Sequence, residues 1–311
     1  MSPASPEPRP ASAVPFPGDG PSVQARPWRA RRRAPGEPTP LVRTGQLLGL
    51  AALTVFCLFP FAWIVATSLK DLSETFLIPP TWVPRHFTLG NFVKIWTIQA
   101  FGRYFFNSLI VSGLTTLLSI VLASLAGYGF SRFRLPGGRA MMVAVLAAQM
   151  FPGIVLLIPY FTKASRLHIL NTYPVLVVAY TSFSLPFCVW MMKGFFDGIP
   201  TELDEAAVID GCSALGAFVR VVLPLSLPGV VATAIFSFLV AWNEYLFAVV
   251  LATRETMYVV TVGIASNIGQ FRIQWNELMA GAVLATVPTI ILYALLERHL
   301  VRGLSAGAVK G

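Results

Sequence analysis

Six long apolar runs alternate with shorter polar segments along most of the chain. Each run is close to the ~20 residues that an α-helix needs to cross the hydrocarbon core of a bilayer. The pattern therefore predicts an all-α membrane protein with six transmembrane helices, in which residues 44–302 form the membrane domain. The predicted spans are Leu47–Leu69, Asn107–Phe130, Ala140–Phe161, Tyr173–Met192, Pro228–Leu251 and Leu278–Leu296.

The composition supports a membrane protein. Of the 311 residues, 55% are hydrophobic and only 12% are charged, whereas about a quarter of the residues of a soluble domain carry charge. The net charge of +9 does not indicate nucleic-acid binding, because the basic residues flank the apolar runs. Most of the 23 Lys and Arg residues fall on the side that also carries both chain ends. The positive-inside rule therefore predicts that both termini are cytoplasmic.

The two ends of the chain differ in composition from the membrane domain. Residues 1–43 are rich in proline and arginine and contain little that could form a core, so we expect a disordered cytoplasmic tail. Residues 303–311 form a second short cytoplasmic tail, built mostly of small residues. The three cysteines, Cys57, Cys188 and Cys212, show neither metal-ligand spacing nor a disulfide framework. We predict no metal site.

The segment from Thr201 to Pro228, between the fourth and fifth runs, has the pattern of a helix–turn–helix. Thr201 can serve as an N-cap with Asp204 reaching back to it, and acidic residues in the first turn favour a helix N-terminus. Gly211 suits a helix end with positive φ. Ser213 can cap a second short helix, which must end before Pro224. We predict a cytoplasmic elbow between transmembrane helices four and five.

One face of the first elbow helix is shallow. Leu203, Ala206, Ala207 and Asp210 follow the i, i+3, i+4, i+7 spacing of one helix face. The two alanines would let another surface approach closely. A plain cytoplasmic loop with no partner is the alternative reading of the same residues.

The elbow also resembles a known motif. The string Glu205-Ala206-Ala207-x-x-Asp210-Gly211, followed by Leu223-Pro224, resembles the EAA loop of ABC importer permeases, and in particular the carbohydrate (maltose-type) branch. The resemblance covers about residues 88–311 and implies a subunit of the bacterial cytoplasmic membrane. It implies that these seven residues couple the chain to an ATP-hydrolysing subunit.

The resemblance also implies the partners and the solute. The partners would be a dimer of ATP-binding subunits, a second homologous permease, an extracytoplasmic solute-binding protein and the lipid bilayer. The solute would be a sugar, such as an oligosaccharide or an α-glucoside of the maltose or trehalose type. A glycerol-phosphate importer is the alternative within the family, and an ion-coupled secondary transporter is the alternative outside it.

Catalytic chemistry is not expected in this chain. No G-x-x-x-x-G-K-[ST] phosphate loop occurs in the sequence, so we expect ATP and Mg²⁺ to be bound by a partner subunit. No histidine lies deep in a predicted span beside a carboxylate or a cysteine. We therefore predict a transport subunit with no catalytic residue and no cofactor of its own.

Polar residues within the apolar runs are candidates for the solute pathway. An ionisable residue inside a span is a functional hypothesis by default, and Trp242-Asn243-Glu244 places an amide and a carboxylate in the outer part of the fifth run. Gln149 lies in the middle of the third run, where a bond between helices is the commoner role of such a residue. Glu244 near an interface could instead simply reach water.

The C-terminal tail is a candidate for contact with the ATPase. Its sequence, with Gly303, Gly307 and Lys310, resembles the ending of maltose-type permeases, in which the tail extends to the ATPase interface. Fraying is the alternative, since chain ends are usually poorly ordered.

Overall fold

The computed structural model describes residues 40–266, 268 and 273–307. The chain divides into two compact units, residues 1–56 and residues 57–311. The described part of the first unit, residues 40–56, is the beginning of α1 (Pro40–Ser68). Its side chains are exposed on every side of the helix, as expected for a helix that lies in lipid. Most of the predicted tail, residues 1–39, lies outside the described residues.

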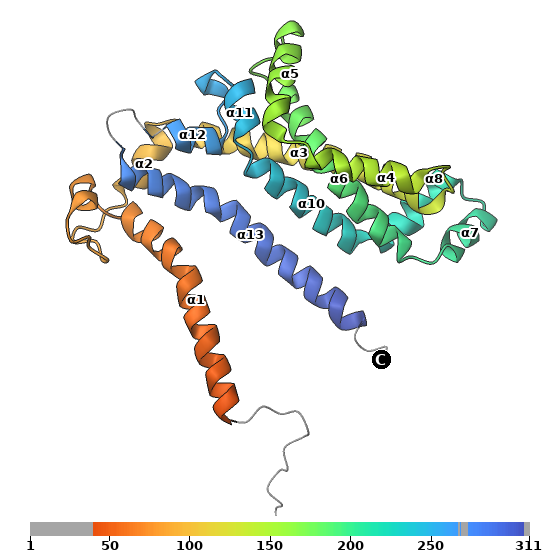
Figure 1. Cartoon of the computed structure of the whole chain (residues 1–311), viewed down its shortest axis with the longest axis horizontal. Coiled ribbons are helices and arrows are strands. Elements are labelled where there is room, and N and C mark those ends of the chain that lie inside the picture. The colour runs from red at the N-terminus through yellow and green to blue at the C-terminus, as the bar shows by residue number, and fades with distance from the viewer. Residues whose placement is uncertain (1–39, 267, 269–272, 308–311) are drawn as a thin grey trace, which may run out of the picture. The chain divides into compact units, whose positions relative to one another are not determined.

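In the described part of the second unit the regular secondary structure is helical, apart from one isolated bridge between Ile268 and Ile273. Short elements follow α1 and precede the first long helix of this unit (Figure 1). The elements after α1 are, in order, η1 (Leu72–Phe76), α2 (Gly90–Thr97), α3 (Phe101–Arg132), α4 (Gly138–Ala147), η2 (Ala148–Met150), α5 (Gly153–Arg166), α6 (Tyr173–Asp197), α7 (Glu202–Ile209), α8 (Ala214–Ala217), the π-helical η3 (Phe218–Val222), α9 (Leu223–Leu225), α10 (Leu227–Trp242), α11 (Leu246–Leu251), η4 (Glu255–Met257), α12 (Val260–Ser266) and α13 (Trp275–Gly307).

The prediction of an all-α membrane fold is confirmed, with a difference in how the spans are built. Four helices of the described residues are long and apolar enough to cross a bilayer, namely α1, α3, α6 and α13. Two bent pairs of helices bring the number to six if each pair counts as one span. The third and fifth predicted spans are therefore not single straight helices.

The third span bends by 90° between α4–η2 and α5. The predicted continuous helix is broken at Phe151–Pro152, between η2 and α5. Phe151 has extended backbone angles, φ −72° and ψ 128°, because the ring of a following proline disfavours the helical conformation. Pro152 then stands before the first residue of α5. The proline that causes this break is visible in the sequence, but it separates two helices and does not merely kink one.

The fifth span keeps both of its predicted ends, since α10 begins at Leu227 and α11 ends at Leu251. Residues Ala214–Leu225 of the elbow precede it and meet Leu227–Trp242 at 80°. The predicted helix over 228–251 is interrupted after Trp242, and α11 begins only at Leu246. The apolar run is continuous in sequence, so the interruption comes from the polar pair Asn243 and Glu244 within it.

The centre of the second unit is formed by α3, α6 and α10, which pack on one another. The buried face of α3 is built largely of small side chains, and Ser119 Oγ lies 2.9 Å from Ser184 Oγ of α6. A Cβ atom at Gly127 would lie 2.9 Å from the backbone nitrogen of Lys193, which is closer than atoms can pack. Small residues thus allow the close approach of two helices, as is common in membrane proteins.

Candidate functional site

A helix–turn–helix lies where the elbow was predicted, formed by α7, a turn, and the helical segment α8–η3–α9; its cytoplasmic location and its coupling role stay predictions. It adjoins the ends of α3 and α6 (Figure 1), and an aromatic cluster joins it to them. The ring of Phe218 in η3 lies 4.7 Å from Tyr128 of α3 and 6.0 Å from Phe196 of α6, measured between centroids. All three side chains are buried. The elbow is therefore packed against the core and does not hang from it as a free loop.

The start of α7 differs from the prediction. Thr201 has helical backbone angles and its side chain makes no capping hydrogen bond. The Asp204 carboxylate does not reach back to Thr201, because it has stronger partners on α3. Its Oδ1 accepts a hydrogen bond from Tyr128 Oη at 2.8 Å, and its Oδ2 accepts one from Arg132 Nε at 2.8 Å. A charged donor outcompetes a backbone amide for a carboxylate.

Arg132 connects three segments of the chain. Besides its ion pair with Asp204, Nη1 donates to the Phe196 carbonyl at 3.0 Å and Nη2 donates to the Ile199 carbonyl at 3.0 Å. The side chains of the ion pair are only 8% and 13% exposed. We call Arg132, Asp204, Tyr128 and the two carbonyls the Arg132 network. It fixes α7 to the ends of α3 and α6, and no sequence motif had indicated it.

The turn after α7 has the predicted geometry. Gly211 has φ +90°, a conformation that glycine adopts without strain. Its amide donates to the Val208 carbonyl at 3.0 Å, and the Cys212 amide donates to the Ala207 carbonyl at 2.9 Å. The Ser213 side chain caps α8 by accepting from the Gly216 amide at 3.1 Å. The expectations for Gly211 and Ser213 are thus met.

Pro224 does not end the second elbow helix as expected. It lies in the first turn of α9, and the helical segment continues to Leu225. The π-helical η3 precedes it, and the Leu223 amide there donates to the Phe218 carbonyl. A proline within such a helical segment is tolerated because a local π-helical adjustment satisfies the freed backbone groups. The direction changes at Ser226, beyond Leu223 and Pro224.

This elbow lies within a segment that matches a known family. Residues 119–306 match the family described as "Binding-protein-dependent transport system inner membrane component". The chain belongs to this family. The resemblance seen in the sequence from Glu205 to Pro224 is therefore confirmed, and the chain is a membrane component of a transport system.

Several characterised permeases are similar over nearly their whole length. The sulfoquinovosyl glycerol transport system permease protein SmoH of Agrobacterium fabrum is 36% identical over 266 residues, which cover 86% of this chain and 93% of that protein. The trehalose/maltose transport system permease protein MalG of Thermococcus litoralis is 36% identical, with coverage of 85% and 96%. The trehalose transport system permease protein SugB of Mycobacterium tuberculosis is 35% identical, with coverage of 82% and 93%.

A solved structure shares the permease fold. It belongs to a bacterial ABC transporter involved in the import of the acidic polysaccharide alginate, and it superposes with a TM-score of 0.72 at 18% sequence identity. The superposition covers 83% of this chain and 96% of that one. At this identity the comparison shows the fold alone.

The elbow of this permease exposes a mixed surface. Ala207 is buried, at 7% exposure, whereas Ala206, Glu205 and Asp210 are exposed. Three of the four residues predicted to share one open face are thus exposed, Leu203 among them, but Ala207 turns toward the permease itself. Other large apolar side chains are exposed beside them, namely Val208, Ile209 and Leu215, with Ile209 at 85%. An apolar surface of this kind on a helix–turn–helix is suited to docking.

Replacement of Gly211 tests the turn. Gly211→Val places a β-branched residue at φ +90°, where the strain is about 1–2 kcal/mol or more. We expect the variant to insert in the membrane but to lose most of its transport activity. Gly211→Asn is the matched control, because asparagine tolerates positive φ and open space surrounds this position. The prediction is wrong if the valine variant transports as well as the asparagine variant.

The predicted pathway residues Trp242, Asn243 and Glu244 are brought together at the break after α10, but they do not share one role. Trp242 is buried, and its Nε1 donates to the Ala285 carbonyl of α13 at 3.1 Å. Asn243 is exposed and donates to the Leu239 carbonyl at 2.8 Å. The Glu244 carboxylate accepts from the Phe247 amide at 3.1 Å and from the Ala248 amide at 3.2 Å. Glu244 therefore caps α11. Its role as a gate stays a prediction.

Glu244→Gln separates the cap from a pathway role. Glutamine keeps the shape but offers one acceptor oxygen where the carboxylate offers two. We therefore expect the free energy of unfolding to fall by about 0.5–2 kcal/mol, because the cap of α11 is weakened. Thermal unfolding in detergent should then occur at a lower temperature than in wild type. Asn243→Ala is the control, since among the described residues the side chain of Asn243 bonds only to the Leu239 carbonyl of its own helix. Unchanged unfolding together with altered transport would instead favour the pathway role.

The remaining predicted residues are separate from this break. Gln149, in η2, donates from Nε2 to the Phe183 carbonyl of α6 at 3.0 Å, which is the bond between helices considered for it. Gly303 and Gly307 lie in α13, so the chain is still helical where a separate tail was expected to begin. Lys310 lies outside the described residues. Contact of the tail with an ATPase stays a prediction.

Proposed function

We propose that this chain is one of two membrane subunits of an ATP-driven importer for a sugar, most simply an oligosaccharide or an α-glucoside. The relatives named above support the solute class, since SmoH and MalG are named for transport of sulfoquinovosyl glycerol and of trehalose or maltose. The other permease subunit and an extracytoplasmic solute-binding protein complete the proposed system.

The proposed mechanism is alternating access driven from the elbow. ATP and Mg²⁺ are bound by a separate ATPase dimer, and the exposed apolar side chains of α7 and α8 dock on that dimer. The observation that carries the proposal is the Arg132 network, because it connects α7 by short hydrogen bonds to α3 and α6. A displacement of α7 on closure of the ATPase is thereby passed to the two helices at the centre of the permease.

The proposal places the elbow and both termini in the cytoplasm. The support is the distribution of Lys and Arg along the sequence. Arg132, Arg134 and Arg139 all lie near the end of α3 that meets the elbow. An ATPase that uses cytoplasmic ATP must dock on this side.

Reconstitution of the whole transport system tests the proposal. Uptake of sugar into proteoliposomes should require ATP and should persist when the proton gradient is collapsed. A screen of solutes for stimulation of ATP hydrolysis should identify a sugar. Uptake that depends on an ion gradient, or stimulation by glycerol phosphates and by no sugar, would contradict it.

A further inference from the structure

A groove lies on the surface of the permease where α3 ends, α4 begins and α6 nears its own end. Its volume is about 530 Å³, and its lining comes from these three helices and from the turn between α3 and α4. We call it the α4 groove. Phe133 and Arg134 border both this groove and the elbow. Since α3, α4 and α6 all belong to spans that are apolar enough to cross a bilayer, the groove lies where the hydrocarbon core meets the polar surface on the elbow side.

The shape of the α4 groove is fixed by packing and by a tight turn. Met142 of α4 is buried in the same apolar cluster as Met192 of α6, which joins these two helices. Between α3 and α4, the Gly138 amide donates to the Leu135 carbonyl at 3.0 Å, and Gly137 has φ +72°. The short turn therefore holds the beginning of α4 close to the end of α3, and the groove is preformed.

Two cations of the α4 groove have no carboxylate partner. Arg134 lies in the turn and Arg139 in the first turn of α4, and both are exposed. Neither forms an ion pair with a carboxylate of the described residues. The third cation of the lining, Lys193, pairs with Asp197. None of the described residues that line the groove is Asp or Glu, so its unpaired positive charge favours an anionic ligand.

The rest of the α4 groove is mostly apolar. Arg139, Met142, Val143 and Leu146 follow the i, i+3, i+4, i+7 spacing of one helix face, and all four line the groove. Leu146 lies two helical turns beyond Arg139, about 10 Å further along α4 at 1.5 Å per residue. Trp190 of α6, which is 49% exposed, also lines the groove. The groove thus offers positive charge at the depth of lipid headgroups and apolar surface at the depth of acyl chains.

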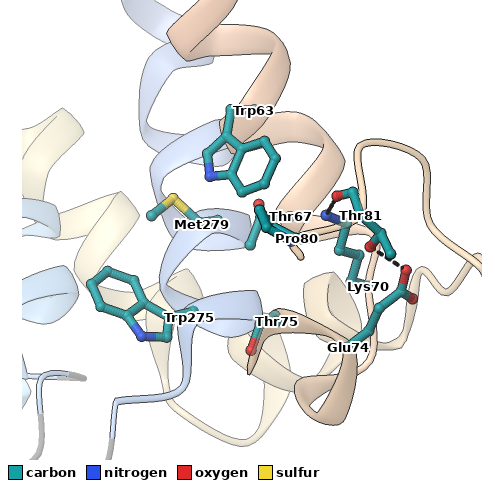
Figure 2. Close-up of a pocket in the computed structure, with 9 residues that line it drawn as sticks. All are labelled: Trp63, Thr67, Lys70, Glu74, Thr75, Pro80, Thr81, Trp275 and Met279. Carbon is teal, nitrogen blue, oxygen red and sulfur yellow. Dashed lines mark hydrogen bonds between the residues drawn. The ribbon is translucent and has the colours of Figure 1, made fainter. Parts of the chain in front are cut away.

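A second polar cavity, between the end of α1 and the start of α13, has a different distribution of charge. Lys70 is buried there and donates to the Thr81 carbonyl, and the Thr81 hydroxyl donates to the Glu74 carboxylate (Figure 2). An ammonium and a carboxylate that line the same cavity offset each other, so this cavity does not select an anion. Unpaired positive charge is therefore a specific property of the α4 groove.

We propose that the α4 groove binds the headgroup and the first acyl carbons of an anionic phospholipid, such as phosphatidylglycerol. The guanidinium groups of Arg134 and Arg139 donate to the phosphate oxygens, and the acyl chains pack on Val143, Leu146 and Trp190. A basic pocket between membrane helices is an arrangement that recognises acidic headgroups. An acidic peptide from the aqueous phase would leave the apolar part of the groove uncovered. The site depends neither on the transported solute nor on an ATPase.

Native mass spectrometry of the full-length chain in detergent tests the proposal, with phosphatidylglycerol and phosphatidylcholine of the same acyl chains as probes. Wild type should bind phosphatidylglycerol roughly tenfold more tightly than phosphatidylcholine. Arg134→Gln and Arg139→Gln should each weaken binding of phosphatidylglycerol roughly fivefold, because each removes one cation near the headgroup, and should change binding of phosphatidylcholine little. Arg220→Gln is the matched control, because it removes an exposed arginine of η3 that does not line the groove.

Val143→Asn tests the apolar part of the groove. Val143 is 61% exposed, so the amide should leave the fold intact but meet the acyl chains of a bound lipid. Both lipids should then bind roughly threefold to tenfold more weakly. A variant that weakens neither lipid would show that the chains lie elsewhere and would overturn the proposal.

Three further results would overturn it. The first is equal binding of phosphatidylglycerol by Arg139→Gln and Arg220→Gln. The second is displacement of this lipid by inorganic phosphate at equal concentration, which would indicate a site for the free ion. The third is loss of the lipid when the second permease subunit binds, which would make the groove a subunit interface. The arginine variants should unfold at the wild-type temperature, since both side chains are exposed and unpaired, so weaker binding is not misfolding. The assay uses no ATP, so a negative result leaves the proposed transport function untouched.

Discussion

Replacing Arg132 with glutamine is expected to abolish solute uptake while leaving the permease in the membrane. The change leaves the Asp204 carboxylate with Tyr128 as its remaining partner in the Arg132 network and frees the carbonyls of Phe196 and Ile199. Removing one partner of a buried ion pair lowers the stability of a protein by about 3–5 kcal/mol. We expect α7 to lose its fixed position, so that ATP hydrolysis continues and uptake falls by at least tenfold, as measured in proteoliposomes.

Arg132→Lys and Lys193→Gln provide the graded comparison. Lysine keeps the charge, but one ammonium cannot reproduce the planar fork that reaches Asp204 and both carbonyls, so its uptake should be intermediate. Lys193→Gln removes an ion pair with Asp197, whose side chains are 30% and 45% exposed. Exposed ion pairs contribute about 0–1 kcal/mol to the stability of a protein. This variant should therefore transport normally. If the Arg132→Gln and Lys193→Gln variants take up solute equally well, the Arg132 network does not couple α7 to solute transport.

Replacing Ile209 with aspartate should block docking of the ATPase. Ile209 is 85% exposed at the end of α7, so an aspartate costs the isolated permease little. In a docked complex the same position is desolvated, where an unpaired carboxylate costs several kcal/mol. We expect the purified permease to lose co-purification with the ATPase and to lose transport. Both follow from one change in a side chain that contributes little to the fold.

Val83→Asp is the matched control for Ile209→Asp. Val83 is 76% exposed in the loop between η1 and α2, so the variant exchanges a similarly exposed apolar side chain for a carboxylate away from the elbow. It should keep the ATPase bound. Recovery of a full complex with Ile209→Asp would show that the exposed side chains of α7 are not the docking surface.

Local signals in the sequence predicted local structure well. The apolar runs indicated α1, α3, α6 and α13, because a span is determined by length and apolar content alone. Gly211 and Ser213 were predictable since each acts on hydrogen bonds within a few residues. The proline at position 152 also indicates a break after Phe151, but the apolar run continues across it, so a single continuous span was predicted.

Contacts between distant residues could not be predicted in the same way. Arg132 and Asp204 are separated by 72 positions, and no pattern in one sequence indicates which carboxylate a given arginine meets. The same long-range bond explains why the Asp204 carboxylate does not reach back to Thr201. Thr201 itself has helical backbone angles in place of the extended ones of an N-cap residue. Ala207 could not be recognised as buried, since its burial depends on the packing of α7 against η3.

The close approach of α3 and α6 at Gly127 limits how the permease can move. A Cβ atom at Gly127 would lie 2.9 Å from the backbone nitrogen of Lys193, so the two helices lie too close there to leave room for a side chain. Together with the Arg132 network, this close packing should make α3, α6 and α7 move as one body. We expect changes of direction at the points where the helical ladder is already interrupted, at Phe151–Pro152 and at Ser226.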